Sequence, residues 1–283
     1  MGELITSYDG MKVADYLRLE RPSKVALVFW HGLGDLVMFL TTFHALRKQF
    51  REIKIDLALQ EGVGQGVLVP DAVLISNHNK ALGGYDYTFQ VHYPMAEGMR
   101  GEWTKNEWCC VSELGISPIN TYPAFRQLKV PKPVGDKYLV GLHFQATALP
   151  NACNPSEEVA ERIWNEVKGA GFMPVETFFK HRYYNPVNEK FPFIPDSRTV
   201  RHLAPTVSSL IALLQLCYAN ICVASGNLPL SLAIAPERLL YLKKDFDISS
   251  YTKHPVPSVD VENYHEGAVK QWLESLKKEE QHE

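Results

Sequence analysis

Several signatures of common protein classes are missing from this chain of 283 residues. No apolar run approaches the roughly 20 residues that a membrane-spanning helix needs. The start of the chain lacks a basic stretch followed by an apolar core, so we expect no signal peptide. The five cysteines are odd in number and fit no zinc-binding spacing. Free thiols are typical of the reducing cytoplasm, where we expect the protein to reside.

Catalytic motifs of fixed spacing are also missing. The sequence has no Gly-x-Ser-x-Gly nucleophile elbow, no Walker loop and no pair of histidines at metal-binding spacing. These absences argue against a zinc enzyme, and we expect neither a bound metal nor a cofactor. The net charge of −3 provides no global attraction for nucleic acid, which weakens a duplex-DNA-binding interpretation.

Helix and strand patterns do alternate along the whole chain, which indicates an α/β fold with mostly parallel sheets. The segment 130–136 interrupts this alternation with two prolines and a glycine, as a linker would. We therefore expect an N-terminal domain over 1–130, a C-terminal domain over 136–262, and a C-terminal helix with a charged tail over 263–283. Strands are predicted at 24–30, 53–59, 72–75, 86–91, 138–144, 173–179, 199–203, 220–224 and 238–242.

The most informative stretch is Lys24–Phe50, which predicts a buried strand, a glycine turn and an amphipathic helix. The turn follows the carboxyl end of the strand, where open α/β sheets bind ligands. It contains Asp35, which suits a general base or a hydroxyl-binding group better than a phosphate cradle. The alternative is an aspartate that only caps the helix.

A second turn, Ser225, Gly226, Asn227 and Leu228, follows a predicted strand and precedes a helix. Four outward backbone N–H groups at a helix start would form an anion site suited to a diphosphate. The alternative is an ordinary turn capped by Ser225 or Asn227. Two other helix starts are marked by Asn154 before Pro155, and by Thr206 or Ser208.

Polar and aromatic residues follow other predicted strands. Lys180 and Arg182 could neutralise a diphosphate, and Gln145 and Thr147 offer polar groups at the same edge, although solvated loops would look alike. After the strand at 86–91, the side chains of three residues could stack on a sugar or a base, or could anchor a loop: His92, Tyr93 and Trp103.

The order of several short motifs over residues 24–235 resembles the ADP-heptose:lipopolysaccharide heptosyltransferases, glycosyltransferase family 9. The resemblance is carried by Gly32-Leu33-Gly34-Asp35, Ala45-Leu46-Arg47-Lys48, Ile53-Lys54-Ile55-Asp56-Leu57, Gly141-Leu142-His143, Pro205-Thr206-Val207-Ser208-Ser209-Leu210 and Ala224-Ser225-Gly226.

The resemblance implies the GT-B architecture, in which two Rossmann-like domains face a cleft. The N-terminal domain would bind the acceptor, with Asp35 as catalytic base and with His31, Gly34, His92, Tyr93 and Trp103 nearby. The C-terminal domain would bind the nucleotide-sugar through the turn at 225–228, with Gln145, Thr147, Lys180 and Arg182. It also implies a C-terminal helix that packs back on the N-terminal domain.

Three positions depart from the family pattern. Ala224 replaces an acidic residue, Pro229 replaces a histidine, and the segment 152–155 lacks the expected lysine. In the family these residues contact the donor sugar and phosphates, so their loss puts heptose as donor in doubt.

The leading hypothesis is a metal-independent glycosyltransferase that uses a nucleotide-sugar and a glycan or lipopolysaccharide-like acceptor. One alternative is a non-catalytic GT-B protein that binds nucleotide-sugars or glycans. Another is an enzyme that glycosylates a hydroxymethylated DNA base, with a basic groove formed by Lys129, Lys132, Lys137, Lys180 and Arg182. A dinucleotide enzyme is disfavoured because the third glycine of its fingerprint is missing.

Overall fold

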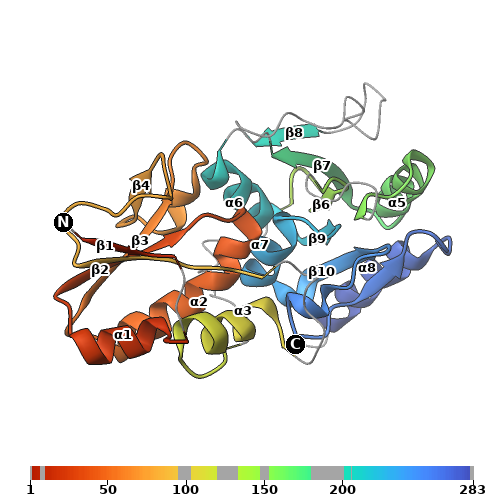
Figure 1. Ribbon diagram of the computed structural model, residues 1–283. Coiled ribbons are helices and arrows are strands. Elements are labelled where there is room, and N and C mark those ends of the chain that lie inside the picture. Colours follow the sequence, from red (N-terminus) through yellow and green to blue (C-terminus); the bar gives the residue numbers. More distant parts are fainter. Residues whose placement is uncertain are drawn as a thin grey trace. The chain divides into compact units, whose positions relative to one another are not determined.

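The computed structural model describes residues 2–6, 10–94, 103–119, 133–146, 153–179, 201–204 and 206–280 (Figure 1). The chain divides into two units. The first consists of Met1–Pro123 with Ile248–His254, and the second of Ala124–Asp247 with Pro255–Glu283. Each unit is built on one parallel sheet, which confirms the predicted α/β fold class.

The first unit has five parallel strands in the order β1-β5-β2-β3-β4. Strand β2 lies at the centre, and its last five residues are buried, as its continuous apolar run predicted. The strands are β1 (Glu3–Ile5), β2 (Lys24–Phe29), β3 (Lys54–Gln60), β4 (Val73–Ile75) and β5 (Tyr87–Gln90). The helices are α1 (Val13–Glu20), α2 (Leu33–Gln49), α3 (Lys105–Trp108), the short 3₁₀ segments η1 (Gln65–Leu68) and η5 (Ile248–Ser250), and the π-helix η3 (Cys109–Leu114).

The second unit has six parallel strands in the order β11-β10-β9-β6-β7-β8. The strands are β6 (Leu139–His143), β7 (Met173–Phe179), β8 (Arg201–Ala204), β9 (Ala219–Cys222), β10 (Leu239–Lys243) and β11 (Ser258–Asp260). The helices are α5 (Glu157–Gly169), α6 (Val207–Leu216), α7 (Asn227–Ile234), α8 (Ala268–Glu280) and the 3₁₀ turn η4 (Pro236–Arg238). All nine predicted strands are present. Among the described strands, β1 and β11, of three residues each, were not predicted.

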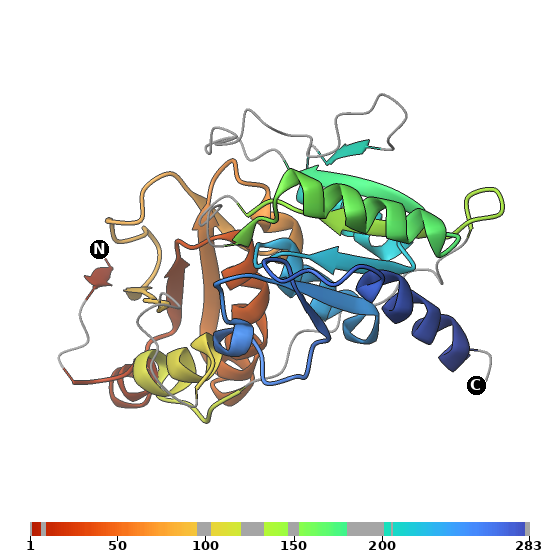
Figure 2. The ribbon, with the colours of Figure 1, turned by 90° about the vertical axis from the view of Figure 1, so that its right-hand side faces the viewer.

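The C-terminal helix α8 groups with the second unit and packs against α5 (Figure 2). Its packing on the N-terminal domain stays a prediction. The segment that groups with the first unit is Ile248–His254. Of the predicted linker, the structure describes residues 133–136, which form a turn closed by pairing of Val134 with Lys137.

Helix starts follow the predictions in one case and differ in another. The Thr206 side chain caps α6 by accepting a hydrogen bond from the backbone N–H of Ser209. Helix α5 is capped by Ser156 and not by Asn154. The Asn154 side chain instead accepts a hydrogen bond from the backbone N–H of Ala146, 2.7 Å away, which holds the described ends of the β6–α5 loop together.

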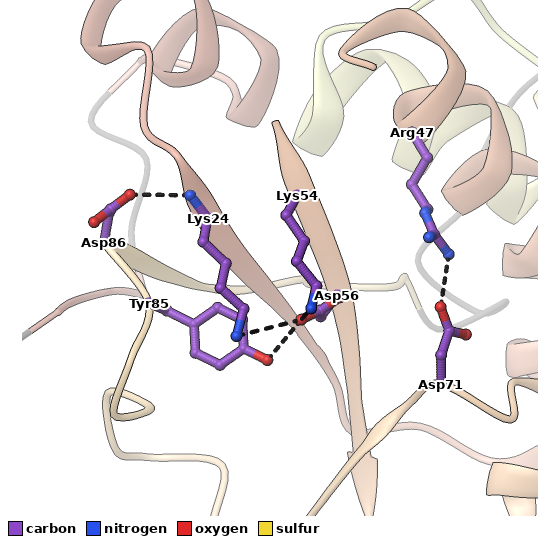
Figure 3. Close-up of polar contacts among 7 residues, drawn as sticks. All are labelled: Lys24, Arg47, Lys54, Asp56, Asp71, Tyr85 and Asp86. Atoms are coloured by element: carbon purple, nitrogen blue, oxygen red, sulfur yellow. Dashed lines mark hydrogen bonds and ion pairs between the residues drawn. The ribbon is translucent and has the colours of Figure 1, made fainter. Parts of the chain in front are cut away.

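A polar cluster lies at the amino ends of β2 and β3 (Figure 3). The buried Asp56 carboxylate accepts a hydrogen bond from the Tyr85 hydroxyl at 2.9 Å and lies 3.7 Å from the ammonium groups of Lys24 and Lys54. Burial, together with the hydrogen bond to Asp56, raises the pKa of Tyr85 to about 12. Because ligands bind at the carboxyl ends of parallel strands, we interpret this cluster as structural. In the described parts of the chain, no helix has the length and apolarity needed to cross a lipid bilayer.

Candidate active site

Asp35 lies in the first turn of α2, just beyond the carboxyl end of β2. The helix is capped by Gly32, and no side chain caps it. Asp35 is therefore not a capping residue, which removes the structural alternative for this position. Its negative charge is still favoured by the positive end of the helix dipole.

The Asp35 carboxylate pairs with Lys105, a residue of α3. The distance from Lys105 Nζ to Asp35 Oδ1 is 2.6 Å, and the lysine side chain is 5% exposed against 21% for the aspartate. Among the described residues, Asp35 Oδ2 has no hydrogen-bond partner. One carboxylate oxygen is thus fixed, while the other remains available to a ligand.

Three further side chains reach the same edge of the sheet, each after a different strand. His31 follows β2, and its Nε2 lies 3.4 Å from the carbonyl oxygen of Val91. Gln65 follows β3 and donates a hydrogen bond from Nε2 to the His31 carbonyl at 3.1 Å. Tyr93 follows β5, and its ring centroid lies 5.8 Å from that of His31. The carboxyl ends of adjacent parallel strands bring these residues together, as they share one edge.

Burial lowers the pKa of the His31 imidazole and so favours its neutral form, and the nearby Asp35 carboxylate opposes this effect only in part. A neutral imidazole can donate or accept one hydrogen bond through each nitrogen, which suits the recognition of a hydroxyl group.

The other predicted acceptor-side residues differ in their surroundings. Gly34 lies in the first turn of α2 and is half-buried. The ring of His92 is exposed, with Nε2 2.9 Å from the carbonyl oxygen of Thr6. Tyr93 is a buried loop anchor packed edge-on against Phe29, so it is not a stacking surface. Trp103 is 41% exposed and remains a candidate for stacking on a sugar.

The strand order places Asp35 at a switch point. From β2 the chain proceeds through β3 to β4 on one side, whereas β5 pairs with β2 on the other side. Open α/β sheets bind ligands in the crevice at such a reversal. Asp35 and Tyr93 follow the two strands that border it.

The second sheet reverses between β6 and β9. Gln145 follows β6 and the turn 225–228 follows β9, so both predicted donor segments flank the switch point of their own unit. Gln145 is half-buried, and its Nε2 has no hydrogen-bond partner within the described residues. Thr147, Lys180 and Arg182, also predicted for the donor, lie outside the described residues.

Two of the four backbone N–H groups of the turn 225–228 form hydrogen bonds within the turn. This corrects the expectation that all four point outward. The N–H of Asn227 donates to Ser225 Oγ at 3.3 Å, and the N–H of Leu228 donates to the Ser225 carbonyl at 3.1 Å. The side chains of Asn227 and Leu228 are buried. The half-buried Ser225 and Gly226 remain the accessible part of the turn.

The Asn227 side chain points into the core, where it contacts the buried His143. Its Nδ2 lies 3.0 Å from His143 Nδ1, while His143 Nε2 lies 3.4 Å from Asn220 Oδ1. The Thr177 hydroxyl also contacts the His143 ring. Burial lowers the pKa of His143 to about 4. The ring is therefore a neutral structural element that joins β6, β7, β9 and α7.

Sequence reasoning missed Lys105, Gln65 and Tyr251, whose ring centroid lies 5.5 Å from Lys105 Nζ. None of them belongs to a recognisable motif, and each is distant in sequence from Asp35. The only local signal was the capping box Thr104–Glu107, which marks the start of the short helix that carries Lys105. In the parts of the chain that the structure describes, no group of three His, Cys, Asp or Glu side chains is arranged to hold a metal ion.

No protein-family model and no curated protein matches the sequence. Solved structures do share the fold. Escherichia coli ADP-heptose lipopolysaccharide heptosyltransferase II has a TM-score of 0.66 at 12% identity, with coverage of 91% of this chain and 99% of that one. E. coli heptosyltransferase WaaC, solved with ADP-2-deoxy-2-fluoro heptose, has a TM-score of 0.56 at 13% identity, covering 91% and 99%.

The dodecameric iron-containing glycosyltransferase TibC of enterotoxigenic E. coli has a TM-score of 0.63 at 12% identity. The match covers 88% of this chain and 67% of TibC. At such low identities these likenesses concern the fold. They confirm the GT-B heptosyltransferase-like architecture that the sequence motifs suggested.

Proposed function

We propose that this protein is a glycosyltransferase that transfers a sugar from a nucleoside diphosphate sugar to a hydroxyl group of a glycan or lipopolysaccharide-like acceptor. The observation that carries the proposal is the position of Asp35 at the switch point of the first sheet, in a fold shared with heptosyltransferases. Its carboxylate has one oxygen fixed by Lys105 and one without a partner among the described residues.

In the proposed reaction, the acceptor hydroxyl hydrogen-bonds to Asp35 Oδ2. Its oxygen attacks the anomeric carbon, its proton passes to Asp35, and the bond from the anomeric carbon to the diphosphate oxygen breaks. The nucleoside diphosphate leaves with the electron pair. Backbone N–H groups of Ser225 and Gly226 stabilise the charge that develops on the leaving group. Lys180 and Arg182 are the proposed cations.

The second unit carries the proposed donor site. Its turn after β9 and Gln145 after β6 lie at the edge where parallel sheets bind nucleotides. WaaC, which has the same fold, was solved with an ADP-sugar analogue. The departures at Ala224 and Pro229 leave the sugar and the nucleotide base open. The five cysteines are free, which is typical of the cytoplasm, where we place the activity.

The test is Asp35→Asn. The amide keeps the shape of the carboxylate but cannot accept the proton, so transfer should fall by about 10²–10⁴-fold. Transfer is measured as nucleoside diphosphate released from a panel of nucleotide-sugars in the presence of acceptor glycans. Binding of the nucleoside diphosphate, measured by calorimetry, should stay at the wild-type level.

The matched control is Asp71→Asn, which removes an exposed carboxylate paired with Arg47 (Figure 3) and should leave transfer unchanged. Wild-type activity that persists in excess EDTA is expected for the proposed metal-independent reaction. Sugar transfer at the wild-type rate by Asp35→Asn would show that Asp35 is not the catalytic base. Binding without any transfer or donor hydrolysis by the wild type would favour a non-catalytic binding protein.

A further inference from the structure

Lys105 is buried, and its ammonium group is surrounded by a carboxylate and two aromatic rings. Its ammonium group lies 2.6 Å from Asp35 Oδ1, 5.0 Å from the ring centroid of Tyr93 and 5.5 Å from that of Tyr251. Aromatic rings at such distances attract a cation through their negative faces. A lysine with a 5% exposed side chain loses most of its hydration, and this set of partners takes the place of the lost water.

Tyr251 comes from Ile248–His254, the segment of the C-terminal half that groups with the first unit. We call it the returning segment. It makes a second contact with α3, because Lys253 Nζ lies 2.8 Å from Glu107 Oε1. The other oxygen of Glu107 accepts a hydrogen bond from the backbone N–H of Thr104 at 2.8 Å. The returning segment therefore holds the helix start that carries Lys105.

Helix α3 continues directly into the π-helix η3, so one short helical segment spans residues 105–114. A helix of this length is marginal in water by itself, so its position depends on the contacts around it. They include the capping box of Thr104 with Glu107, the Lys253–Glu107 pair, and the hydrogen bond of the Thr42 hydroxyl of α2 to Asn106 Oδ1 at 2.6 Å. These contacts join α3 to α2, the helix of Asp35, and to the returning segment.

We propose that Lys105 is the positioning residue for the Asp35 carboxylate, and that the returning segment completes this arrangement through Tyr251 and Lys253. Lys105 fixes Oδ1 and thereby directs Oδ2 toward the acceptor hydroxyl. Residues 248–254 thus belong to the catalytic centre of the first unit, although they come from the far end of the chain. This role in catalysis rests on the proposed function.

The first measurement does not depend on activity. The carboxylates of the full-length protein, without substrate, are labelled with a carbodiimide and an amine and quantified by mass spectrometry. Lys105→Met has a side chain of similar length without charge, and Tyr251→Leu removes the ring. Both should increase labelling of Asp35 severalfold, because Lys105→Met removes the partner of the carboxylate and Tyr251→Leu removes a ring that holds this partner in place. Lys105→Arg and Tyr251→Phe keep the charge and the ring, and should stay closer to the wild type.

The matched control is Arg47→Met. It removes an ion pair made by the last turn of the same helix α2 (Figure 3), and should leave labelling of Asp35 unchanged. Circular dichroism and the thermal unfolding midpoint identify variants that have lost the fold. Lys253→Met provides a further variant at an exposed site, with a smaller increase in labelling expected.

The second measurement is transfer. Lys105→Met should lower kcat by about 10²-fold, the typical effect of misplacing a reacting group by about 1 Å, while KM for the donor changes little. Unchanged labelling of Asp35 in folded Lys105→Met and Tyr251→Leu overturns the inference, whatever the activity. Increased labelling in a protein that transfers no sugar overturns the proposed function but supports the fixation of Asp35 by Lys105.

Discussion

At the scale of the residue, His143 belongs to a motif that suggested a ligand-binding domain, but its own side chain has a structural role. Gly141-Leu142-His143 suggested the opening strand of a second domain, and β6 is the first strand of the second unit. The imidazole itself is fully buried and contacts Asn220, Thr177 and Asn227. Gly141 is required beside it, because a Cβ there would lie 2.6 Å from Asn220 Oδ1. In this protein, Gly141 and His143 of the motif therefore have a packing role in the core of the second unit.

The buried His143 predicts that stability falls in mild acid. Burial lowers its pKa to about 4 in the folded state, against about 6.5 when unfolded. Between these values only the unfolded state binds the proton, so the free energy of unfolding decreases as the pH falls. From pH 7 to pH 5 this one group should cost about 2 kcal/mol.

The measurement is urea unfolding at both pH values for the wild type and His143→Gln. The variant should lose less stability on acidification, whatever its stability at pH 7, because glutamine does not titrate. Equal losses in the two proteins would show that His143 is protonated in the folded state.

At the scale of the element, a single carboxylate caps the start of the C-terminal helix. Glu166 of α5 accepts hydrogen bonds from the backbone N–H groups of Gly267, Val269 and Lys270 at 2.8, 3.0 and 3.1 Å. These groups lie at the start of α8, where N–H groups lack partners within the helix. The charge also complements the helix dipole, which explains why α8 stays on the second unit.

Removing this carboxylate should weaken the attachment of α8. Glu166→Ala should lower the free energy of unfolding by about 1.5–3 kcal/mol, the range for hydrogen bonds to a charged group. Glu166→Gln keeps one acceptor oxygen and should lose less. Urea unfolding gives the stability, and hydrogen exchange at Val269 reports the local opening. The exposed Glu161→Ala on the same helix is the control, and an equal loss in both alanine variants would contradict this role.

Helix starts were only partly predictable from the sequence. Thr206 satisfies the rule for a capping residue, and both hydrogen bonds of its hydroxyl go to Ser209, within the first turn of the helix that it caps. Asn154 satisfies the same rule, but its amide oxygen bonds to the N–H of Ala146. Ser156, two residues later, therefore takes the capping position. A capping rule cannot tell which of two polar side chains has a better partner elsewhere in the fold.

At the scale of the whole molecule, each of the two units has one parallel sheet with one switch point. The proposed acceptor and donor sites occupy these two switch points, one in each unit. A nucleoside diphosphate should therefore bind and stabilise the second unit selectively. This expectation is open to a direct test because each unit reports separately in hydrogen exchange.

The prediction concerns ADP, UDP and GDP, each added to the full-length protein. The accepted nucleotide, at 100 times its dissociation constant, should raise the free energy of unfolding by about 2.7 kcal/mol. It should also slow hydrogen exchange at Ser225 and Gly226, with little change near Asp35. The corresponding nucleosides, which lack the diphosphate, are the controls. Equal protection by nucleoside and nucleotide would exclude a diphosphate site at this turn.

The sequence by itself determined the fold class, nine of the eleven described strands and the positions of Asp35 and the turn 225–228 at strand ends. These follow from hydrophobic periodicity and glycine placement, which act over a few residues. Only the tertiary structure decided that Asp35 pairs with Lys105, seventy residues away, that Tyr251 lies beside that lysine, and that Asn227 points inward to His143. Such contacts depend on which strand ends and loops meet at a sheet edge, and no local pattern encodes that geometry.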